Sequence, residues 1–295
     1  MYELIQVSPH DYYVDCPAKI GLCRLNEQDV CLIDSGSDKD AGRKVMKIIT
    51  ENGWRLTAIY NTHSHADHIG GNKYLYEQTG CAIYAPGIEQ AFTRHPILEP
   101  ALLYGGCPPS ELRHKFLLAQ ESPAAPLCEA VLPAGFSLIP LPGHSFDMVG
   151  LRTPDDTVYL ADCLSSRETL DKYGIGYVHD VGAYLQTLET VKDLRAKLFI
   201  PSHAAPTEDI TALAQYNIDK TNEIAARILT LCAQPIGFEL LLSRLFEGYG
   251  LTMTMQQHAL VGSTVRSYLT YLKESGRVTA FFESNLLLWQ AKENG

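Results

Sequence analysis

The stretch Thr62-His63-Ser64-His65-Ala66-Asp67-His68-Ile69-Gly70-Gly71 places four potential metal ligands within six positions. It follows residues 56–60, an apolar run rich in β-branched and aromatic residues that predicts a buried strand. Imidazoles and a carboxylate buried so close together would repel one another or lack partners unless a cation organised them. The stretch therefore predicts a strand that opens into a metal-binding loop.

Other apolar runs in the chain also end in a potential ligand. They lead into Asp34-Ser35-Gly36, Pro142-Gly143-His144-Ser145, Asp162 and His203. A rigid sheet can hold the residues that follow its strands to the tolerance that a metal site requires. Taken singly, such His and Asp residues are commonly turn or cap residues. Their order along the chain after the dense motif makes them candidate ligands.

On these residues the chain resembles the metallo-β-lactamase-fold hydrolase superfamily. The resemblance covers residues 1–206, and residues 86–135 match least well. It implies an α/β protein with a four-layer αββα sandwich. The implied site residues are His63, His65 and His144 for one metal ion, Asp67, His68 and His203 for a second, and Asp162 as the bridge. Asp34 is implied to support the ligands through hydrogen bonds.

The ligand types predict the chemistry of the site. Neutral imidazoles and carboxylates suit zinc, and also iron or manganese, so we expect two divalent metal ions with zinc favoured. Two such ions at roughly 3.5 to 4 Å can share a water, lower its pKa and stabilise an oxyanion. We therefore expect a metal-bridged hydroxide, oriented by Asp67, that attacks a small ester, thioester or related substrate. Within the superfamily, the chain is similar to the glyoxalase II branch.

Two other activities remain open at this point. Relatives that are mononuclear iron persulfide dioxygenases keep a similar His-rich motif and use only part of it, so the metal count separates them from a dinuclear hydrolase. Some nucleases of the superfamily carry a winged-helix-like tail, and salt-dependent RNA binding would support a metal-dependent ribonuclease. A noncatalytic binding protein is disfavoured because the ligand set has no gap.

Length, composition and charge predict a globular protein with one large and one small domain. The chain has 295 residues, of which 46% are hydrophobic, and a formal net charge of -10. This charge disfavours nonspecific attraction to nucleic acid or anionic membranes. There is no apolar run of membrane-spanning length and no secretion signal, so we expect a cytoplasmic location. The expected partner is a small-molecule substrate, and a homodimer remains open.

The eight cysteines form neither a CxxC pair nor a compact framework, which predicts reduced thiols that pack as small hydrophobes. Cys163, which follows Asp162, and Cys107 are the thiols most able to contact metal or substrate.

Strands are predicted at residues 4–14, 19–25, 29–34 and 81–84, and helices at 38–52 and 72–78. The proline-rich segment of about residues 86–135 is predicted to be an irregular insertion between His68 and His144. We interpret it as a lid over the substrate, although a segment that only packs is an equal alternative. The candidate substrate contacts in it are Tyr104, Cys107, His114 and Lys115.

Residues 207–295 are predicted to form a separate C-terminal domain. Periodicity indicates helices at residues 211–232, 238–246 and 262–274, followed by a two-stranded wing at 277–282 and 286–289. This tail resembles a winged-helix module and departs from the glutathione-binding helical domain of the glyoxalase II branch. It holds seven basic and nine acidic residues, whereas a nucleic-acid reader should be basic on its working face. A packing or dimerisation role is favoured.

Overall fold

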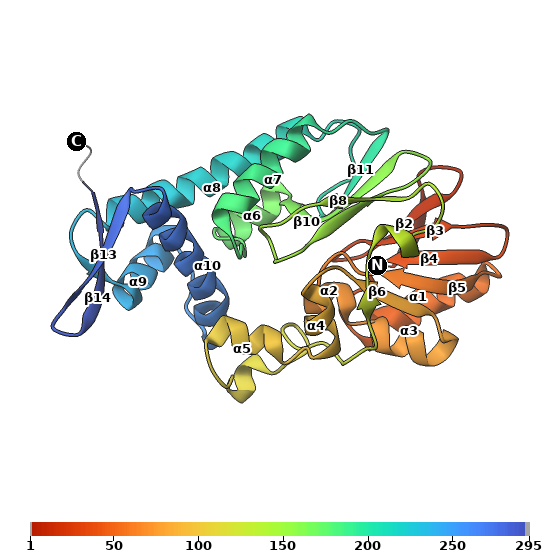
Figure 1. The fold of residues 1–295 in the computed structure, drawn as a ribbon, viewed down its shortest axis with the longest axis horizontal. Helices are drawn as coiled ribbons and strands as arrows, with labels where there is room; N and C mark the ends of the chain where they lie inside the picture. The colour runs from red at the N-terminus through yellow and green to blue at the C-terminus, as the bar shows by residue number, and fades with distance from the viewer. Residues whose placement is uncertain (1, 293–295) are drawn as a thin grey trace.

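The computed structural model describes residues 2–292, and its first seven strands form one sheet in chain order (Figure 1). These strands are β1 (Glu3–Gln6), β2 (Asp11–Asp15), β3 (Ile20–Arg24), β4 (Asp29–Ile33), β5 (Arg55–Tyr60), β6 (Ala82–Ala85) and β7 (Ala125–Pro126). Strands β1 to β4 pair antiparallel, and β4 to β7 pair in parallel. Helices α1 (Lys39–Glu51) and α3 (Asn72–Thr79) pack on one face of this sheet.

A second sheet has the order β11 (Leu198–His203), β10 (Thr157–Ser165), β9 (Val149–Arg152) and β8 (Ser137–Pro140). Its outer face is covered by α7 (Val181–Asp193) and α8 (Thr211–Leu231), and α6 (Arg167–Tyr173) follows β10. The inner faces of the two sheets share a core that includes Ile33, Tyr60, Leu151 and Ile200. The layers therefore run helix, sheet, sheet, helix, as the family resemblance implies.

The central strands are apolar throughout because they are covered on both sides. Val30, Leu32 and Ile33 of β4 are all buried, and the strand lies between α1 and the second sheet. The helix that follows begins after Asp38, whose side chain accepts hydrogen bonds from the backbone N–H groups of Asp40 and Ala41. This cap fixes where the β4–α1 loop ends, a few residues after Asp34.

The N-terminal strand prediction is wrong in one respect. The sequence predicts one strand over residues 4–14, but β1 and β2 form a hairpin, in which the N–H groups of Val7 and Ser8 both donate to the carbonyl of Asp11. Because apolar residues lie on both sides of the turn, the sequence has the pattern of one continuous apolar strand. Helices α6 and α7, which follow β10 and cover the second sheet, are also absent from the sequence prediction.

The insertion contains more regular structure than expected. It forms α4 (Glu89–Arg94), α5 (Leu98–Tyr104), the short 3-10 turns η1 (Ser110–Leu112) and η2 (Glu129–Val131), and the edge strand β7. Leu103 and Leu112 pack with Ala259 in a small buried cluster, so the insertion contacts the C-terminal part of the chain. The one-turn helix α2 (Ala66–Ile69) lies in the His-rich motif.

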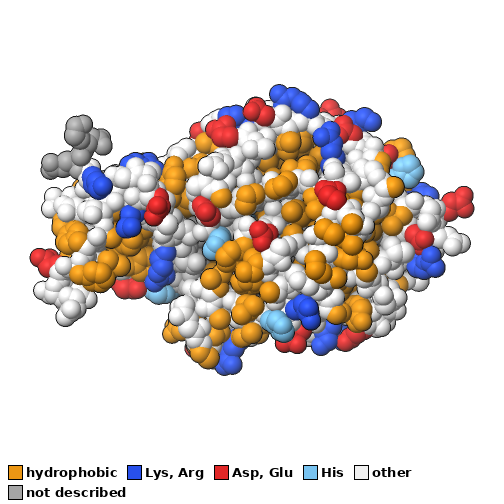
Figure 2. All heavy atoms as spheres, viewed as in Figure 1, with side chains coloured by type: hydrophobic (Ala, Val, Ile, Leu, Met, Phe, Trp, Pro, Cys, Tyr) orange, Lys and Arg blue, Asp and Glu red, His pale blue; other side chains and the backbone are white. Residues whose placement is uncertain are grey.

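The C-terminal part consists of α8, β12 (Ile236–Gly237), α9 (Phe238–Tyr249), α10 (Met255–Glu274), β13 (Val278–Glu283) and β14 (Leu286–Ala291). Its strands have the order β12-β14-β13, and Ser284 and Asn285 turn between the last two with positive φ angles. Helix α10 begins earlier than residue 262 because Thr254 caps it. Apolar side chains gather at this end of the molecule (Figure 2), where Phe282 and Leu286 are exposed.

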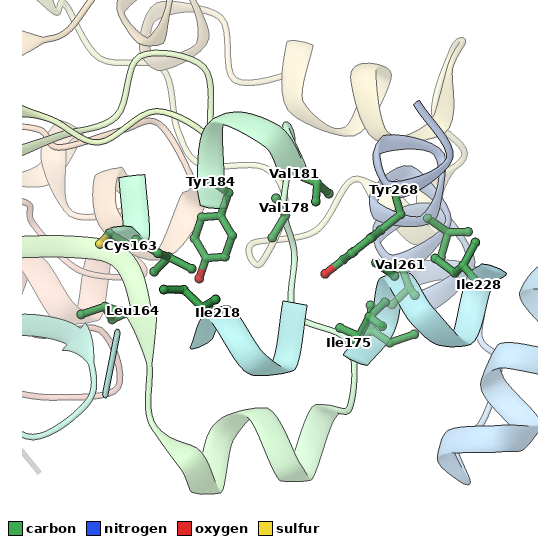
Figure 3. Close-up of a cluster of buried hydrophobic side chains, with 14 of the residues drawn as sticks. Cys163, Leu164, Ile175, Val178, Val181, Tyr184, Ile218, Ile228, Val261 and Tyr268 are labelled. Atoms are coloured by element: carbon green, nitrogen blue, oxygen red, sulfur yellow. The ribbon is translucent and has the colours of Figure 1, made fainter. Parts of the chain in front are cut away.

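The C-terminal part shares its core with the second sheet (Figure 3). Cys163 and Tyr184 belong to the same buried cluster as Ile218 of α8 and Tyr268 of α10. Helix α8 thus covers β10 and also begins the C-terminal part, so a boundary at residues 206 and 207 separates β10 from its own covering helix. Among residues 2–292, no helix combines the length and hydropathy needed to cross a membrane.

Candidate metal centre

The His-rich motif occupies the loop after β5 and the short helix α2, and its two glycines let this loop approach the β4–α1 loop closely. A Cβ on Gly70 would lie 2.3 Å from the carbonyl carbon of Ser37, and one on Gly71 would lie 2.3 Å from the carbonyl oxygen of Ser35. Only glycine fits at such distances. The Gly-Gly pair therefore sets the position of the loop that carries His63, His65, Asp67 and His68.

Four side chains converge to form what we call the first donor group: His63, His65, His144 and Asp162. Nδ1 of His65 lies 3.1 Å from Nε2 of His63 and 3.0 Å from Nε2 of His144. The Asp162 carboxylate lies 3.5 Å from Nε2 of His144. Three imidazole nitrogens and a carboxylate that face one point form a donor set typical of zinc and related divalent ions.

The second donor group consists of Asp67, His68, Asp162 and His203. Nε2 of His203 lies 3.1 Å from Oδ2 of Asp162 and 3.4 Å from Oδ2 of Asp67. Nε2 of His68 lies 3.0 Å from Oδ1 of Asp162. Asp162 belongs to both groups, so its two carboxylate oxygens lie between them.

Asp162 lies inside β10, at a local irregularity of the strand, and does not end the strand as the sequence predicts. The register of β10 against β11 shifts on both sides of Ala161, whose φ angle is 50°. A positive φ costs a residue other than glycine of order 1 kcal/mol and is common where structure is held for function. The irregularity comes directly before Asp162, and Asp162 is 8% exposed.

Asp34 determines which ring nitrogen carries the proton in two histidines, in His68 directly and in His63 through Thr62. Its Oδ2 accepts hydrogen bonds from Nδ1 of His68 at 2.8 Å and from the Thr62 hydroxyl at 2.7 Å. Because that hydroxyl donates to Asp34, its oxygen is free to accept from Nδ1 of His63, 3.0 Å away. Nε2 of both rings is thereby left with its lone pair directed into the site.

Backbone carbonyls fix which ring nitrogen carries the proton in two further histidines. Nδ1 of His144 lies 3.2 Å from the carbonyl oxygen of Tyr177, and Nδ1 of His203 lies 3.0 Å from that of Pro17. A carbonyl can only accept, so each Nδ1 carries the proton and each Nε2 faces the centre.

The residues fit a bound cation by two further criteria. Nε2 of His68 and Oδ1 of Asp162 are buried and have no hydrogen-bond partner, although they lie close together. Burial lowers the pKa of His65 to about 4 and that of His144 to about 3, which keeps both rings in the neutral form that binds metals. Burial also acts on His203, but the charge of Asp162 outweighs it and raises the pKa to about 10.

The structure adds two buried carboxylates that sequence reasoning missed, Glu89 in α4 and Glu99 in α5. Glu89 is 1% exposed, and Oε1 of Glu99 lies 3.6 Å from Nε2 of His65. Burial raises the pKa of Glu99 well above its usual range. The one available signal was their position beside the apolar residues Ile88 and Leu98, since an acidic residue in such a place can be buried with a partner.

The residues that the sequence predicts as substrate contacts differ in their positions and their neighbours. Tyr104 ends α5 and is 47% exposed, and Cys107 is also exposed. The ammonium group of Lys115 pairs with Asp38 at 2.8 Å, and the ring of His114 packs near Phe116. Their contact with substrate remains a prediction.

Cys163 does not belong to either donor group and packs in the core under the second sheet (Figure 3). Burial raises the pKa of its thiol.

A cavity of about 540 Å³ opens beside the second donor group. His203 lines it together with Tyr173 and Tyr177 from the segment around α6, and with Leu260 from α10. The cavity is bordered by both apolar side chains and a few polar ones, as small-molecule sites are.

Residues 15–203 match the sequence model of the metallo-beta-lactamase superfamily. The chain belongs to this superfamily. A metallo-beta-lactamase family protein from Thermus thermophilus has a similar structure, with a TM-score of 0.72, 16% identity, and coverage of 99% of this chain and 98% of that one. The αββα fold expected from the sequence is confirmed.

Two curated relatives of this superfamily member are enzymes by name. A hydroxyacylglutathione hydrolase of Erythrobacter litoralis is 44% identical over 57 residues, which is 18% of this chain and 23% of the relative. An atrochrysone carboxyl ACP thioesterase of Aspergillus fumigatus is 24% identical over 202 residues, 67% of this chain and 54% of the relative. These matches span a quarter to about half of the relatives' lengths. Together with the donor groups, the superfamily implies divalent metal ions.

Proposed function

We propose that this superfamily member is a dinuclear metal-dependent hydrolase that acts on a small thioester or ester. The observation that carries the proposal is Asp162, whose carboxylate belongs to both donor groups. His63, His65 and His144 would hold one ion, and Asp67, His68 and His203 would hold the other. When bound, the ions would lower the pKa of a water and stabilise the negative charge of the transition state.

The chain's own residues then orient the reactants. Asp34 and Thr62 hold protons on the outer nitrogens of His68 and His63, so those rings cannot turn. The side chain of Asp67 is 40% exposed, the most open of the second donor group. It can therefore accept a hydrogen bond from a water on the substrate side and direct the attack of that water on an acyl carbon.

The cavity supports a small acyl substrate. Its walls include Leu170, Ile175 and Val261, which suit an apolar acyl or alkyl group, and Lys172 and Gln257, which suit a polar end. The names of both relatives describe hydrolysis of a thioester, so among acyl substrates we place thioesters first.

We propose that the winged-helix-like C-terminal part has a packing role. Helix α10, the helix that such a module would place in a nucleic-acid groove, instead packs on α5, α7 and α8. Arg266 lies over the ring of Phe238, and Arg277 over that of Tyr271. Basic side chains are interspersed with acidic ones on the face shown in Figure 2. These contacts favour a small molecule over RNA as the substrate.

The first test is the metal content of protein purified without added metal or chelator, beside His68→Ala. We expect about two divalent ions per chain, falling to about one in the variant because the second donor group loses a ligand. Elemental analysis gives both values. A single iron that His68→Ala leaves in place would contradict the dinuclear site and favour a mononuclear iron dioxygenase that acts on persulfides.

Activity is tested with acyl thioesters and their oxygen-ester counterparts. Turnover should disappear in His65→Ala, whose far-ultraviolet circular dichroism should remain that of the wild type because the residue lies in a loop. A His65→Ala protein with nearly wild-type turnover would show that hydrolysis does not depend on this centre.

A further inference from the structure

The carboxylate of Glu89 joins the two loops that supply the imidazoles of the first donor group. Oε2 of Glu89 accepts hydrogen bonds from both the backbone N–H and the hydroxyl of Ser64, the residue between His63 and His65. Its Oε1 accepts from the backbone N–H of Asp147, 3.2 Å away, in the loop that carries His144. One buried side chain from the insertion thus holds both ligand loops.

The link between the insertion and the His144 loop is reciprocal. The Asp147 side chain accepts a hydrogen bond of 2.8 Å from the backbone N–H of Ile88, the residue before Glu89. Gly87 has a φ angle of +42°, and a Cβ there would meet the Asp147 carboxylate at 2.0 Å. The two segments are therefore in close contact at a backbone conformation that favours glycine, which is unlike the loose contact of a movable lid.

Glu99 lies beside the remaining ring of the first donor group, just beyond hydrogen-bond distance. His65 presents Nδ1 to the centre, so its outer nitrogen is Nε2, and the Glu99 carboxylate lies 3.6 Å from that atom. The side chain of Glu99 is 12% exposed. In the other ligand histidines, the outer nitrogen faces Asp34, Thr62 or a backbone carbonyl.

Helix α5, which carries Glu99, is itself held by the C-terminal part. Leu103 of α5 packs with Leu112, Leu117 and Ala259 of α10, and Tyr177 packs against the same cluster. The carbonyl oxygen of Tyr177 accepts the proton of Nδ1 of His144. Helix α10 therefore packs against α5, which carries Glu99 beside His65, and against Tyr177, whose carbonyl oxygen faces His144.

We propose that the insertion is a brace for the first metal ion, in which Glu89 and Glu99 are positioning residues that act through His63, His65 and His144. This inference rests on the proposed dinuclear site. The brace sets the geometry of the first donor group and leaves the second, which is supported by Asp34 and Pro17, unaffected. Loss of such a supporting partner typically costs 10-fold to 100-fold in metal affinity.

The experiment titrates Zn²⁺ and Co²⁺ into metal-free wild type, Glu89→Gln, Glu99→Ala and Glu99→Gln, with the visible spectrum of bound Co²⁺ as a second readout. His144→Ala and His203→Ala identify which binding step belongs to which donor group. Asp11→Asn is the matched control, because Asp11 is also a 1% exposed carboxylate that joins two segments, through Thr153. It lies at the opposite end of β2 from Pro17 and His203.

We expect Glu89→Gln and Glu99→Ala to weaken the step assigned to the first donor group by about 10-fold to 100-fold. Glu99→Gln keeps an acceptor oxygen and should restore most of the affinity, and Asp11→Asn should change neither step. Should Glu89→Gln fail to fold, the Glu99 pair decides the question, because both variants keep the Glu89 link.

Unchanged affinities in Glu89→Gln and Glu99→Ala would overturn the brace, as would an equal loss in both steps. A wild type that binds a single ion would refute the dinuclear function alone, and loss of that ion in the Glu99→Ala variant would still support the brace. A wild type that binds neither metal would refute both.

Discussion

Asp34 shows how much one side chain can do in this site. It lies directly after β4 with a positive φ angle of 64°, a conformation that Asn and Asp tolerate better than most residues. Its carboxylate accepts hydrogen bonds from His68, from the Thr62 hydroxyl and from the Thr62 backbone. The side chain therefore joins β4 to the His-rich loop and also orients His68, a proposed ligand.

Asp34→Asn tests these roles without disturbing the backbone. An amide group at the Oδ2 position cannot accept from His68 or from the Thr62 hydroxyl, and we expect a loss of about 2 kcal/mol in the free energy of unfolding. The affinity of the second ion should fall by about 10-fold to 100-fold, since His68 loses its fixed proton. Urea unfolding and metal titration measure the two effects. Unchanged metal affinity would show that Asp34 is purely structural.

At the scale of elements, the start of α1 links the main fold to the insertion. Asp38 caps the helix and pairs with Lys115, whose side chain is 61% exposed. Asp38→Ala should lower the free energy of unfolding by about 1 kcal/mol because two backbone donors lose their acceptor. Lys115→Ala removes the ion pair alone and should cost less, because solvent screens an exposed pair. Thermal unfolding measures the stability of both variants. Equal losses of stability would show that the cap contributes no more than the ion pair.

The elements that the sequence predicted well are those with strong local signals. The apolar run of β4, the helix predicted over residues 38–52 and the turn between the two strands of the wing all depend on neighbours in the chain. The candidate ligands were predicted in the same way, and the structure brings their side chains together. Glu89 and Glu99 could not be found, because their partners Ser64, Asp147 and His65 lie far from them in sequence.

At the scale of the whole molecule, the C-terminal part completes the core of the second sheet. Leu164 and Tyr184 are buried in a cluster that also contains Ile218 and Ile224 of α8, and Tyr268 of α10. A chain cut at the predicted boundary would expose this apolar surface.

A fragment of residues 1–206 should therefore be insoluble or lack cooperative unfolding, whereas we expect the full chain, with its shared core intact, to unfold cooperatively. Soluble yield and thermal unfolding of the fragment, beside the full chain, measure this. A soluble fragment that unfolds cooperatively and binds its full complement of metal would establish residues 1–206 as an independent domain.

The donor groups draw their ligands from both sheets. His63, His65, Asp67 and His68 follow β5 of the first sheet, while His144, Asp162 and His203 come from the second. Such contacts between distant parts of the chain form late in folding, because closing long loops is slow. During synthesis, the second donor group would thus stay incomplete until His203 and its strand have emerged. Metal capture should consequently coincide with the last steps of maturation and report that the two sheets have docked.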